Sequence, residues 1–561
     1  MHLDKCTTTA PNGKTYTRVL LRTTFRENGK VKHRTIGNLS NCSPQEISAI
    51  QFALENKDSI PPSDTNATVF PKSGWSSRQG ASVGAVVVVH QIAKRLGITS
   101  ALGNDRQGKL ALWQVIARVI DQGSRLSAVR LATSHAACDI LDCESFNEND
   151  LYKNLDWLHE RQAIIEQRLF KSRYKEDKPG LFLYDVTSSY LEGQDNELAA
   201  FGYNRDKKSG KKQIVVGLLC DITGNPLSIE VFEGNTSDVK TMPSQIKKAA
   251  GRFGCSEVTF VGDRGMIKNT VIDELELVDG FHYITALTKP QMQTLLTDGI
   301  IQLSLFDKEI HEVEDTEKNV RYILRRNDVR AEEIRSSRRD KLHSAQIFCE
   351  KKNVYLATHA KSKTETALKA VQDKIAQLKI DRWVSVDVDQ HLREIKIKQV
   401  VEQLAEEEKL DGCYVIKTDL EKSAVDDKTV HDRYKDLAKV EWAFRISKTA
   451  ELELRPINVR KEERTRAHVF VVMMAYMIVR ELARLWDSVD LTVQEALNEL
   501  STLCVMELND GSVTKINTIP KPRSSVATLV DKAKVILPEL LRARGEVVAT
   551  RKKLHSERKR V

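Results

Sequence analysis

Three acidic residues lie where the surrounding sequence predicts buried secondary structure. Asp185 lies inside the apolar segment LFLYDV at 181–186, Asp263 closely follows the apolar segment 258–261, and Glu441 lies within a predicted helix. Burying an unpaired carboxylate costs free energy, so such a position requires a hydrogen-bonding partner or a cation. A carboxylate that caps a helix or closes a turn is the alternative for either aspartate taken alone.

The helix predicted for residues 427–449 carries polar groups on a face that should pack against the rest of the protein. Its residues at spacings of three and four share one stripe: Tyr434, Leu437, Glu441, Phe444 and Lys448. An acid, a phenol and an ammonium on such a stripe indicate a site for charged ligands. The alternative is a half-exposed helix on which Glu441 and Lys448 extend to solvent past their apolar neighbours.

The pattern of apolar and turn residues predicts the elements that position the two aspartates. Three strands come first and are joined by short links, which indicates an antiparallel meander. The predicted order is strand, strand, strand, helix, strand, helix, strand, at 181–190, 213–220, 226–232, 239–250, 258–261, 266–278 and 281–287. This order predicts a mixed sheet, and Asp263 lies just after a strand's carboxyl end, where α/β sheets place their sites.

Composition and charge narrow the class of protein. With 561 residues, of which 41% are hydrophobic and 29% charged, the chain is predicted to form several packed globular units. The net charge of +9 favours a polyanionic partner. We expect no signal peptide or membrane span, because the longest apolar run, 469–479, suits a buried helix.

The cysteines indicate a reducing compartment. Nine are scattered along the chain without a CxxC pair, which is typical of an intracellular protein. The spacing of His135, Cys138 and Cys143 matches no standard zinc pattern. We therefore predict a bacterial cytoplasmic protein and assign no zinc site.

Taken together, the motifs resemble those of a known family. The segments YDVT at 184–187 and VGDRG at 261–265, with the box of Tyr434, Glu441 and Lys448, look like the three signatures of bacterial insertion-sequence transposases of the DDE type. The group concerned has a Y-(2)-R-(3)-E-(6)-K box, and the segment RPINVRKEERTRAH at 455–468 is also typical of it. The resemblance covers roughly residues 180–480. One position departs from the box, because Leu437 stands where the family has an arginine.

The resemblance implies an α/β fold: a ribonuclease H-like mixed-sheet core with an inserted, partly β domain and an N-terminal helical domain. It implies that Asp185, Asp263 and Glu441 are catalytic and converge to bind two Mg²⁺ ions, with Mn²⁺ able to substitute and Asp185 bridging both. Mg²⁺ prefers oxygen ligands, and two ions stabilise the attacking and leaving oxygens of a phosphoryl transfer. Tyr434 and Lys448 would hold the DNA backbone near the scissile bond.

The implied activity is cleavage that frees a 3′ hydroxyl at the transposon end, followed by attack of that hydroxyl on target DNA. The partners would be double-stranded DNA, as terminal inverted repeats and as target, and a second copy of the chain. Two alternatives remain: a ribonuclease H-like nuclease or resolvase, and a non-catalytic DNA-binding protein derived from a transposase.

With that resemblance, the chain is predicted to divide into seven segments. The dipeptide Asn28-Gly29 between β-rich runs predicts a hairpin, and Pro, Ser, Thr and Asn enrichment marks a linker. The segments are an N-terminal β-hairpin region 1–58, a linker 59–80, a helical DNA-binding domain 81–175, core 176–288, an insertion 289–410, core 411–486, and a C-terminal region 487–561 with a basic tail. A helical scaffold is the alternative for 81–175.

Two features of the insertion have both a functional and a structural interpretation. Seven arginines between 321 and 339 suit a nucleic-acid surface, although glutamates among them also fit a solvated helix face. Trp383 could stack on an unpaired base, but core packing is the simpler expectation for a single tryptophan.

Overall fold

A computed structural model describes residues 1–55, 76–175, 178–193, 195–206, 208–389, 391–448, 452–454, 457–509, 515–544, 546 and 548. Most of the predicted linker, the basic tail and part of the segment 455–468 lie outside these residues. The chain divides into two compact units, of which the first combines Met1–Val87, Thr133–Asp142 and Leu497–Val547. The second contains Val88–Ala132, Cys143–Ala496 and Val548–Val561.

The described residues of the first unit form two small antiparallel sheets. One has the order β1 (His2–Thr9), β2 (Thr15–Glu27), β3 (Lys30–Asn38), and α1 (Pro44–Glu55) follows it. Asn28 and Gly29 join β2 to β3 with φ of 48° and 76°, the positive values that a tight hairpin turn requires. The predicted hairpin is therefore confirmed, and β1 adds a strand that the sequence pattern did not reveal.

The other small sheet joins distant parts of the chain. Its order is β16 (Lys515–Thr518), β15 (Cys504–Asn509), β4 (Ser76–Ser82). Strand β4 begins inside the predicted linker 59–80, so that linker boundary is wrong. Local composition did not reveal β4, because its pairing partner lies near the other end of the chain. The short helices α6 (Ala137–Leu141) and α18 (Ser524–Lys532) also belong to this unit.

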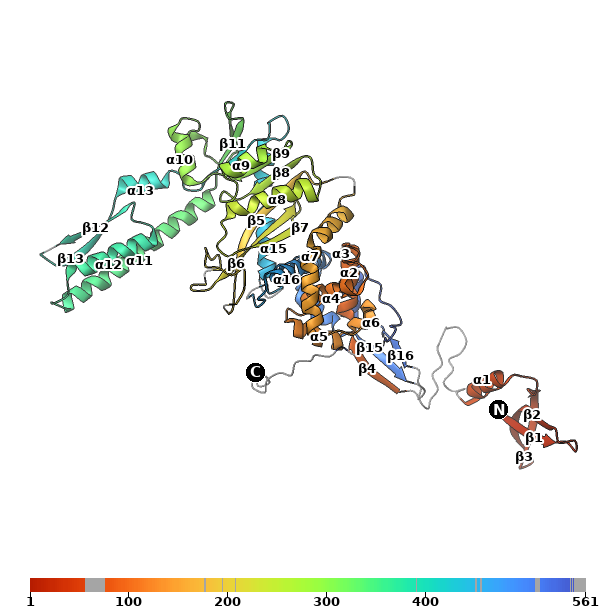
Figure 1. The fold of residues 1–561 in the computed structure, drawn as a ribbon. Helices are drawn as coiled ribbons and strands as arrows, with labels where there is room; N and C mark the ends of the chain where they lie inside the picture. Colours follow the sequence, from red (N-terminus) through yellow and green to blue (C-terminus); the bar gives the residue numbers. More distant parts are fainter. Residues whose placement is uncertain are drawn as a thin grey trace. The chain divides into compact units, whose positions relative to one another are not determined.

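The second unit is built on an eight-stranded mixed sheet (Figure 1). Its order is β10 (His311–Asp315), β11 (Val320–Arg326), β14 (Cys413–Thr418), β9 (Phe281–Ala286), β8 (Val258–Gly262), β5 (Leu181–Tyr190), β6 (Gln213–Asp221), β7 (Pro226–Phe232). Strands β5, β6 and β7 form an antiparallel meander, whereas β8 and β9 run parallel to β5. This is the expected ribonuclease H-like arrangement, and the predicted order of strands and helices is confirmed.

Helices cover both faces of this sheet. On one face, α8 (Met242–Lys247) and α9 (Asn269–Glu276) pack with the inward side chains of β5 and β6, including Phe182, Tyr184 and Val186. On the other face, α14 (Asp427–Lys435) packs on β8 and β9, and α15 (Ala438–Lys448) packs on β5 and β6. Because side chains alternate across a strand, Asp185 points away from Tyr184 and toward the face covered by α14 and α15.

A helical layer follows the pattern expected for residues 81–175. It contains α2 (Gly84–Arg95), α3 (Ile98–Leu102), α4 (Arg106–Ile120), α5 (Arg125–Ser134) and α7 (Glu148–Arg173). The long helix α16 (Glu462–Leu485) packs against α4 and α7 and buries the whole apolar run 469–479, and α17 (Val493–Leu500) follows it. Within the described residues, no helix combines the length and apolar character needed to cross a bilayer.

The predicted insertion 289–410 contributes to the main sheet as well as to a separate layer. Strands β10 and β11 pair beside β14, and α10 (Lys289–Thr297) packs near them. The remainder is α11 (Asp328–Thr358), α12 (Thr364–Leu378), the hairpin of β12 (Val384–Asp389) and β13 (Glu394–Gln399), and α13 (Val401–Glu408) (Figure 1). Trp383 is buried in the core of this remainder, which favours its structural interpretation.

Candidate active site

Asp185 and Asp263 are neighbours on two adjacent parallel strands. Asp185 lies in the middle of β5, and the register of the pair places Tyr184 opposite Gly262. Asp263 directly follows Gly262, the last residue of β8. The two aspartates are therefore brought together by strand pairing, although 77 residues separate them in the chain.

Glu441 reaches this region from the first turn of α15. The single helix predicted for 427–449 is instead two helices that meet at Asp436 and Leu437. The backbone N–H of Leu437 donates to the Tyr434 carbonyl at 3.3 Å, so the ladder tightens locally. The Asp436 carboxylate stabilises the break, because it pairs with Arg433 at 2.9 Å and with Lys439 at 2.8 Å.

The three acids line one cavity of about 480 Å³, together with Tyr434 and Leu437. The Tyr434 hydroxyl donates to Oδ1 of Asp263 at 3.4 Å. The structure therefore brings together four of the five residues singled out from the sequence. It does so with residues of two adjacent strands and two consecutive helices.

The electrostatics of this cavity are those of crowded carboxylates. Burial raises the pKa of Asp185 to about 7, and the nearby charges of Asp263 and Glu441 add to the rise. A hydrogen bond from the backbone N–H of Val186, at 2.8 Å, opposes the rise only in part. Burial, with the Asp263 charge, also raises the pKa of the Tyr434 phenol above its ordinary range. A cation between the acids would relieve this repulsion.

The three carboxylates are suitable ligands for a divalent cation, but their side chains are not arranged around a common point. Asp185 and Asp263 each accept a hydrogen bond from the following backbone N–H, at 2.8 and 2.7 Å. Within the described residues, no three His, Cys, Asp or Glu side chains are close enough to hold an ion. The three carboxylates therefore share a cavity, but they would have to rotate toward one another to coordinate an ion together. All three offer oxygen, the ligand that Mg²⁺ prefers.

Lys448, the fifth predicted residue, does not line the cavity. Its ammonium lies 2.9 Å from Oδ1 of Asp206, and the two side chains are 10% and 2% exposed. Asp206 also accepts the backbone N–H of Tyr190, at the end of β5, at 3.2 Å. Lys448 therefore ties α15 to the end of the central strand. Lys448 was identified only from its spacing in the predicted helix, and spacing does not reveal a buried partner 242 residues away.

The cavity also contains an arginine that the sequence analysis missed. Arg205 lies in the connection between β5 and β6, and both oxygens of Asp238 accept from its Nη2 at 2.6 Å. The only local signal was a charged stretch, NRDKKSGKK at 204–212, which resembles an ordinary exposed loop.

The arginines of the insertion do not form a free basic surface. Among the described residues, six of the seven pair with carboxylates: Arg321, Arg326, Arg330, Arg335, Arg338 and Arg339. Arg338, for example, contacts both oxygens of the fully buried Asp411 at 2.9 Å. This pairing favours a structural role over the predicted nucleic-acid surface.

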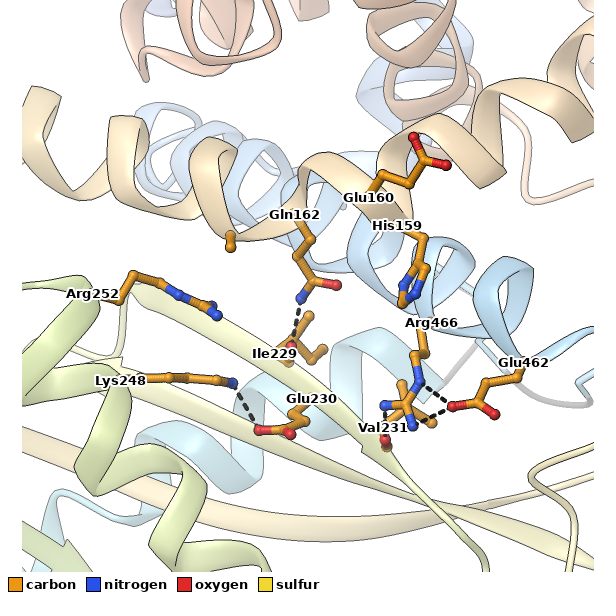
Figure 2. A pocket seen from close by; sticks show the side chains of 11 residues that line it. His159, Glu160, Gln162, Ile229, Glu230, Val231, Lys248, Arg252, Glu462 and Arg466 are labelled. Atoms are coloured by element: carbon orange, nitrogen blue, oxygen red, sulfur yellow. Dashed lines mark hydrogen bonds and ion pairs between the residues drawn. The ribbon is translucent and has the colours of Figure 1, made fainter.

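A second cavity, of about 270 Å³, lies against the edge strand β7 (Figure 2). Gln162 donates to the carbonyl of Ile229 at 2.7 Å, and Arg466 donates to the carbonyl of Val231. Lys248 pairs with Glu230 at 2.8 Å in the same cavity. These side chains cover the unpaired edge of the sheet, which would otherwise be open to pairing with another chain.

Two family models match the chain. Residues 176–478 match the family described as the transposase DDE domain, and residues 3–62 match the N-terminal domain of IS1634 family transposases. The first match spans more than half of the chain and includes all three acids of the cavity. No curated protein matches the chain.

One solved structure with detectable likeness is a cryo-EM structure of the piggyBac transposase synaptic complex with hairpin DNA. The identity is 9%, and the match covers 80% of this chain and 75% of that one. Its TM-score of 0.34 is too low for that likeness to support an inference about fold or function.

Proposed function

The chain belongs to the DDE transposase family, and on that premise we propose that Asp185, Asp263 and Glu441 are the carboxylates of its catalytic site. As a transposase it is an enzyme that cleaves DNA and transfers strands. The observation that carries the assignment is the shared cavity, which brings together acids from β5, the end of β8 and α15. Burial there, with the charges of Asp263 and Glu441, raises the pKa of Asp185. Groups with strongly perturbed pKa values in a cleft are characteristic of functional sites.

Transposases of this family use divalent metal ions. We infer two Mg²⁺ ions, with Mn²⁺ able to substitute, with Asp185 facing both and Asp263 and Glu441 one each. Such ions supply charge stabilisation to the attacking and leaving oxygens of an in-line displacement. The carboxylates would hold the ions in their deprotonated form, so Asp185 would be the group that limits metal affinity near neutral pH.

Two further side chains of the cavity are suited to DNA phosphates. Tyr434 can donate its hydroxyl to a phosphate oxygen once its contact with Asp263 is released. Arg205, oriented by Asp238, presents a guanidinium, the group best matched to a phosphate's paired oxygens. The family has an arginine at the position of Leu437, and Arg205 would supply the positive charge that this chain lacks there.

The DNA substrates follow from the same assignment. We propose that the chain binds the terminal inverted repeats of its own element and transfers their 3′ ends to target DNA. Two ends must be cut and joined in one event, which favours a homodimer on DNA.

The test compares Asp263→Asn and Glu441→Gln with wild type on DNA that carries the element's ends. Loss of either carboxylate should reduce Mg²⁺-dependent cleavage and strand transfer at least 10³-fold and leave binding of the end DNA within about twofold. Asp432→Asn is a matched control, because this carboxylate of α14 is 52% exposed and lies outside the cavity lining. Cleavage that persists in either cavity variant would overturn that residue's assignment.

A further inference from the structure

A third cavity, of about 370 Å³, lies in the helical layer, away from the carboxylates described above. Arg118 from α4, Arg125 from the start of α5 and His468 from α16 line it. The two guanidinium groups are among the most buried charges of the chain, with 5% and 6% of each residue exposed. Nothing in the proposed catalytic chemistry uses them.

The arginines are only partly satisfied by the protein. Arg118 donates to the carbonyls of Gln122 and Gly123, at 2.5 and 3.1 Å. Nη2 of Arg125 lies 3.0 Å from Nδ1 of His468. The Nε atoms of both arginines are buried and have no hydrogen-bond partner. A buried donor without a partner is costly, so these atoms indicate a missing acceptor.

No described carboxylate neutralises this pair. Elsewhere in the second unit, Arg252, Arg321 and Arg338 have acidic partners. Within the described part of the chain, neither Arg118 nor Arg125 forms an ion pair. Two buried cations without a counterion destabilise the fold, because both charges are desolvated and repel each other.

Among the described residues, the nearest acids, Asp121 and Glu453, raise the pKa of Arg118 through their charge but form no ion pair with either arginine, and the histidine adds no negative charge. The Asp121 carboxylate accepts the Ser127 hydroxyl at 2.5 Å, and Glu453, which also lines the cavity, is an exposed residue. Burial and the two arginines hold the pKa of His468 well below its usual value. Burial lowers the pKa of Arg118 to about 10, although the charges of Glu453 and Asp121 oppose this, and burial together with the Arg118 charge lowers the pKa of Arg125 to about 9.

The connection between α4 and α5 adds to the positive potential. Gly123 and Ser124 line the cavity just before the first turn of α5, and a helix N-terminus attracts anions. A side chain at Gly123 would place its Cβ 2.4 Å from Cβ and Oγ of Ser127. Glycine therefore permits the close turn that brings this connection against the Arg118 guanidinium.

We propose that this cavity is an oxyanion site that binds a phosphate group. Two arginine forks match the oxygen pairs of a phosphate, and a phosphate would supply both the missing charge and the acceptors for the unpaired Nε atoms. The ligand could be a phosphodiester of the DNA backbone or a free phosphate. The site does not depend on the assignment of the three catalytic carboxylates.

The experiment uses the full chain and inorganic phosphate as the first probe. Thermal unfolding of wild type is followed against phosphate concentration at constant ionic strength, with chloride as the balancing anion. Stabilisation should saturate, as binding to the folded state alone requires. Arg118→Met should weaken the apparent phosphate affinity about tenfold or more, since a charge-assisted contact is lost.

Two other variants keep the test decisive. Asn458→Asp places a carboxylate in the cavity at an exposed position and should remove the phosphate response even if Arg118→Met folds poorly. Arg484→Met is the matched control, since it removes one cation that is already paired with Glu481 at 2.7 Å and should leave the response unchanged. A phosphate response that is equal in wild type and Asn458→Asp overturns the proposal. A phosphate response that is absent in wild type overturns it when the DNA titration below also shows no effect of Asn458→Asp.

A DNA titration separates the two sources of phosphate. If the backbone fills the site, Asn458→Asp should weaken DNA binding and reduce the slope of log affinity against log salt by about one. An unchanged slope together with a lost phosphate response assigns the site to free phosphate. An unchanged slope with no phosphate response in wild type overturns the proposal. Cleavage activity is not the readout, so failure here is distinguishable from failure of the catalytic assignment.

Discussion

Asp185→Asn is expected to stabilise the folded protein at pH 8 while it abolishes cleavage. The pKa of the Asp185 carboxyl rises from 3.8 to about 7, first because of burial and then because of Asp263 and Glu441. A group whose pKa is raised by folding costs no stability below its unfolded value. The cost grows between pH 4 and pH 7 and is complete above pH 7. Asparagine has the same shape without the charge, so it removes this cost.

The size of the gain follows from the interval between the two pKa values. The interval from 3.8 to about 7 corresponds to roughly 4 kcal/mol, at about 1.4 kcal/mol for each pKa unit. Part of the Asp185 side chain faces the open cavity, where solvent screens the charge. The gain at pH 8 should therefore be at most about 4 kcal/mol, and the gain at pH 5.5 should be about half as large.

The assay is chemical unfolding of wild type and Asp185→Asn at pH 8 and pH 5.5 without divalent ions. Asp221→Asn is the matched control with the opposite sign. Although burial alone would raise the pKa of Asp221, hydrogen bonds from Tyr174, Thr223 and Asn225 hold it below its usual value, so its loss should destabilise the protein at pH 8. Mg²⁺ should then stabilise wild type and not Asp185→Asn.

Two results would refute this reasoning. A variant that is less stable than wild type at pH 8 would mean that Asp185 is satisfied by its surroundings rather than strained by them. A gain of equal size at both pH values would mean that packing, and not ionisation, causes it.

Three further variants test the surroundings of the site. Lys448→Met should cost about 3–5 kcal/mol in urea unfolding, because it removes the ammonium that pairs with the buried Asp206; unchanged stability with weaker DNA binding would instead support the DNA-binding role expected from the sequence. Gly217→Ala should lower stability by about 1–3 kcal/mol in thermal unfolding, because its Cβ would lie 2.2 Å from the Tyr184 hydroxyl, and an unchanged midpoint would contradict this. Arg205→Met should slow single-turnover cleavage by about 10²-fold with end binding retained; full activity would remove Arg205 from the site.

Much of the core could be predicted from the sequence, because its signals are local. The apolar runs of β5 and β8 and the turn between β6 and β7 mark strands whichever partners they later find. The hairpin of β2 and β3 was equally readable, since Asn28 and Gly29 tolerate the positive φ that the turn requires. The boundaries of the insertion could not be predicted in this way, because β11, the partner of β10, also pairs with β14, a strand far along the chain.

The acids were identified by residue type and spacing, whereas their neighbours were not. Tyr434, Glu441 and Lys448 have the spacing of one helical stripe, yet Tyr434 lies on a different helix from the other two, and Lys448 pairs with the buried Asp206 instead of lining the cavity. Arg205 was overlooked because a charged loop usually lies in solvent.

The sequence by itself determined the identity of the three acids, the order of strands and helices around them, and the resemblance to DDE transposases. These depend on residue type and on periodicity, which the chain carries locally. Only the tertiary structure decided which side chains meet: the crowding that perturbs Asp185, the Lys448–Asp206 pair and the uncompensated pair of Arg118 and Arg125. Each arises between residues distant in the chain or from burial, and the cost of a charge depends on the partners and solvent that folding leaves around it.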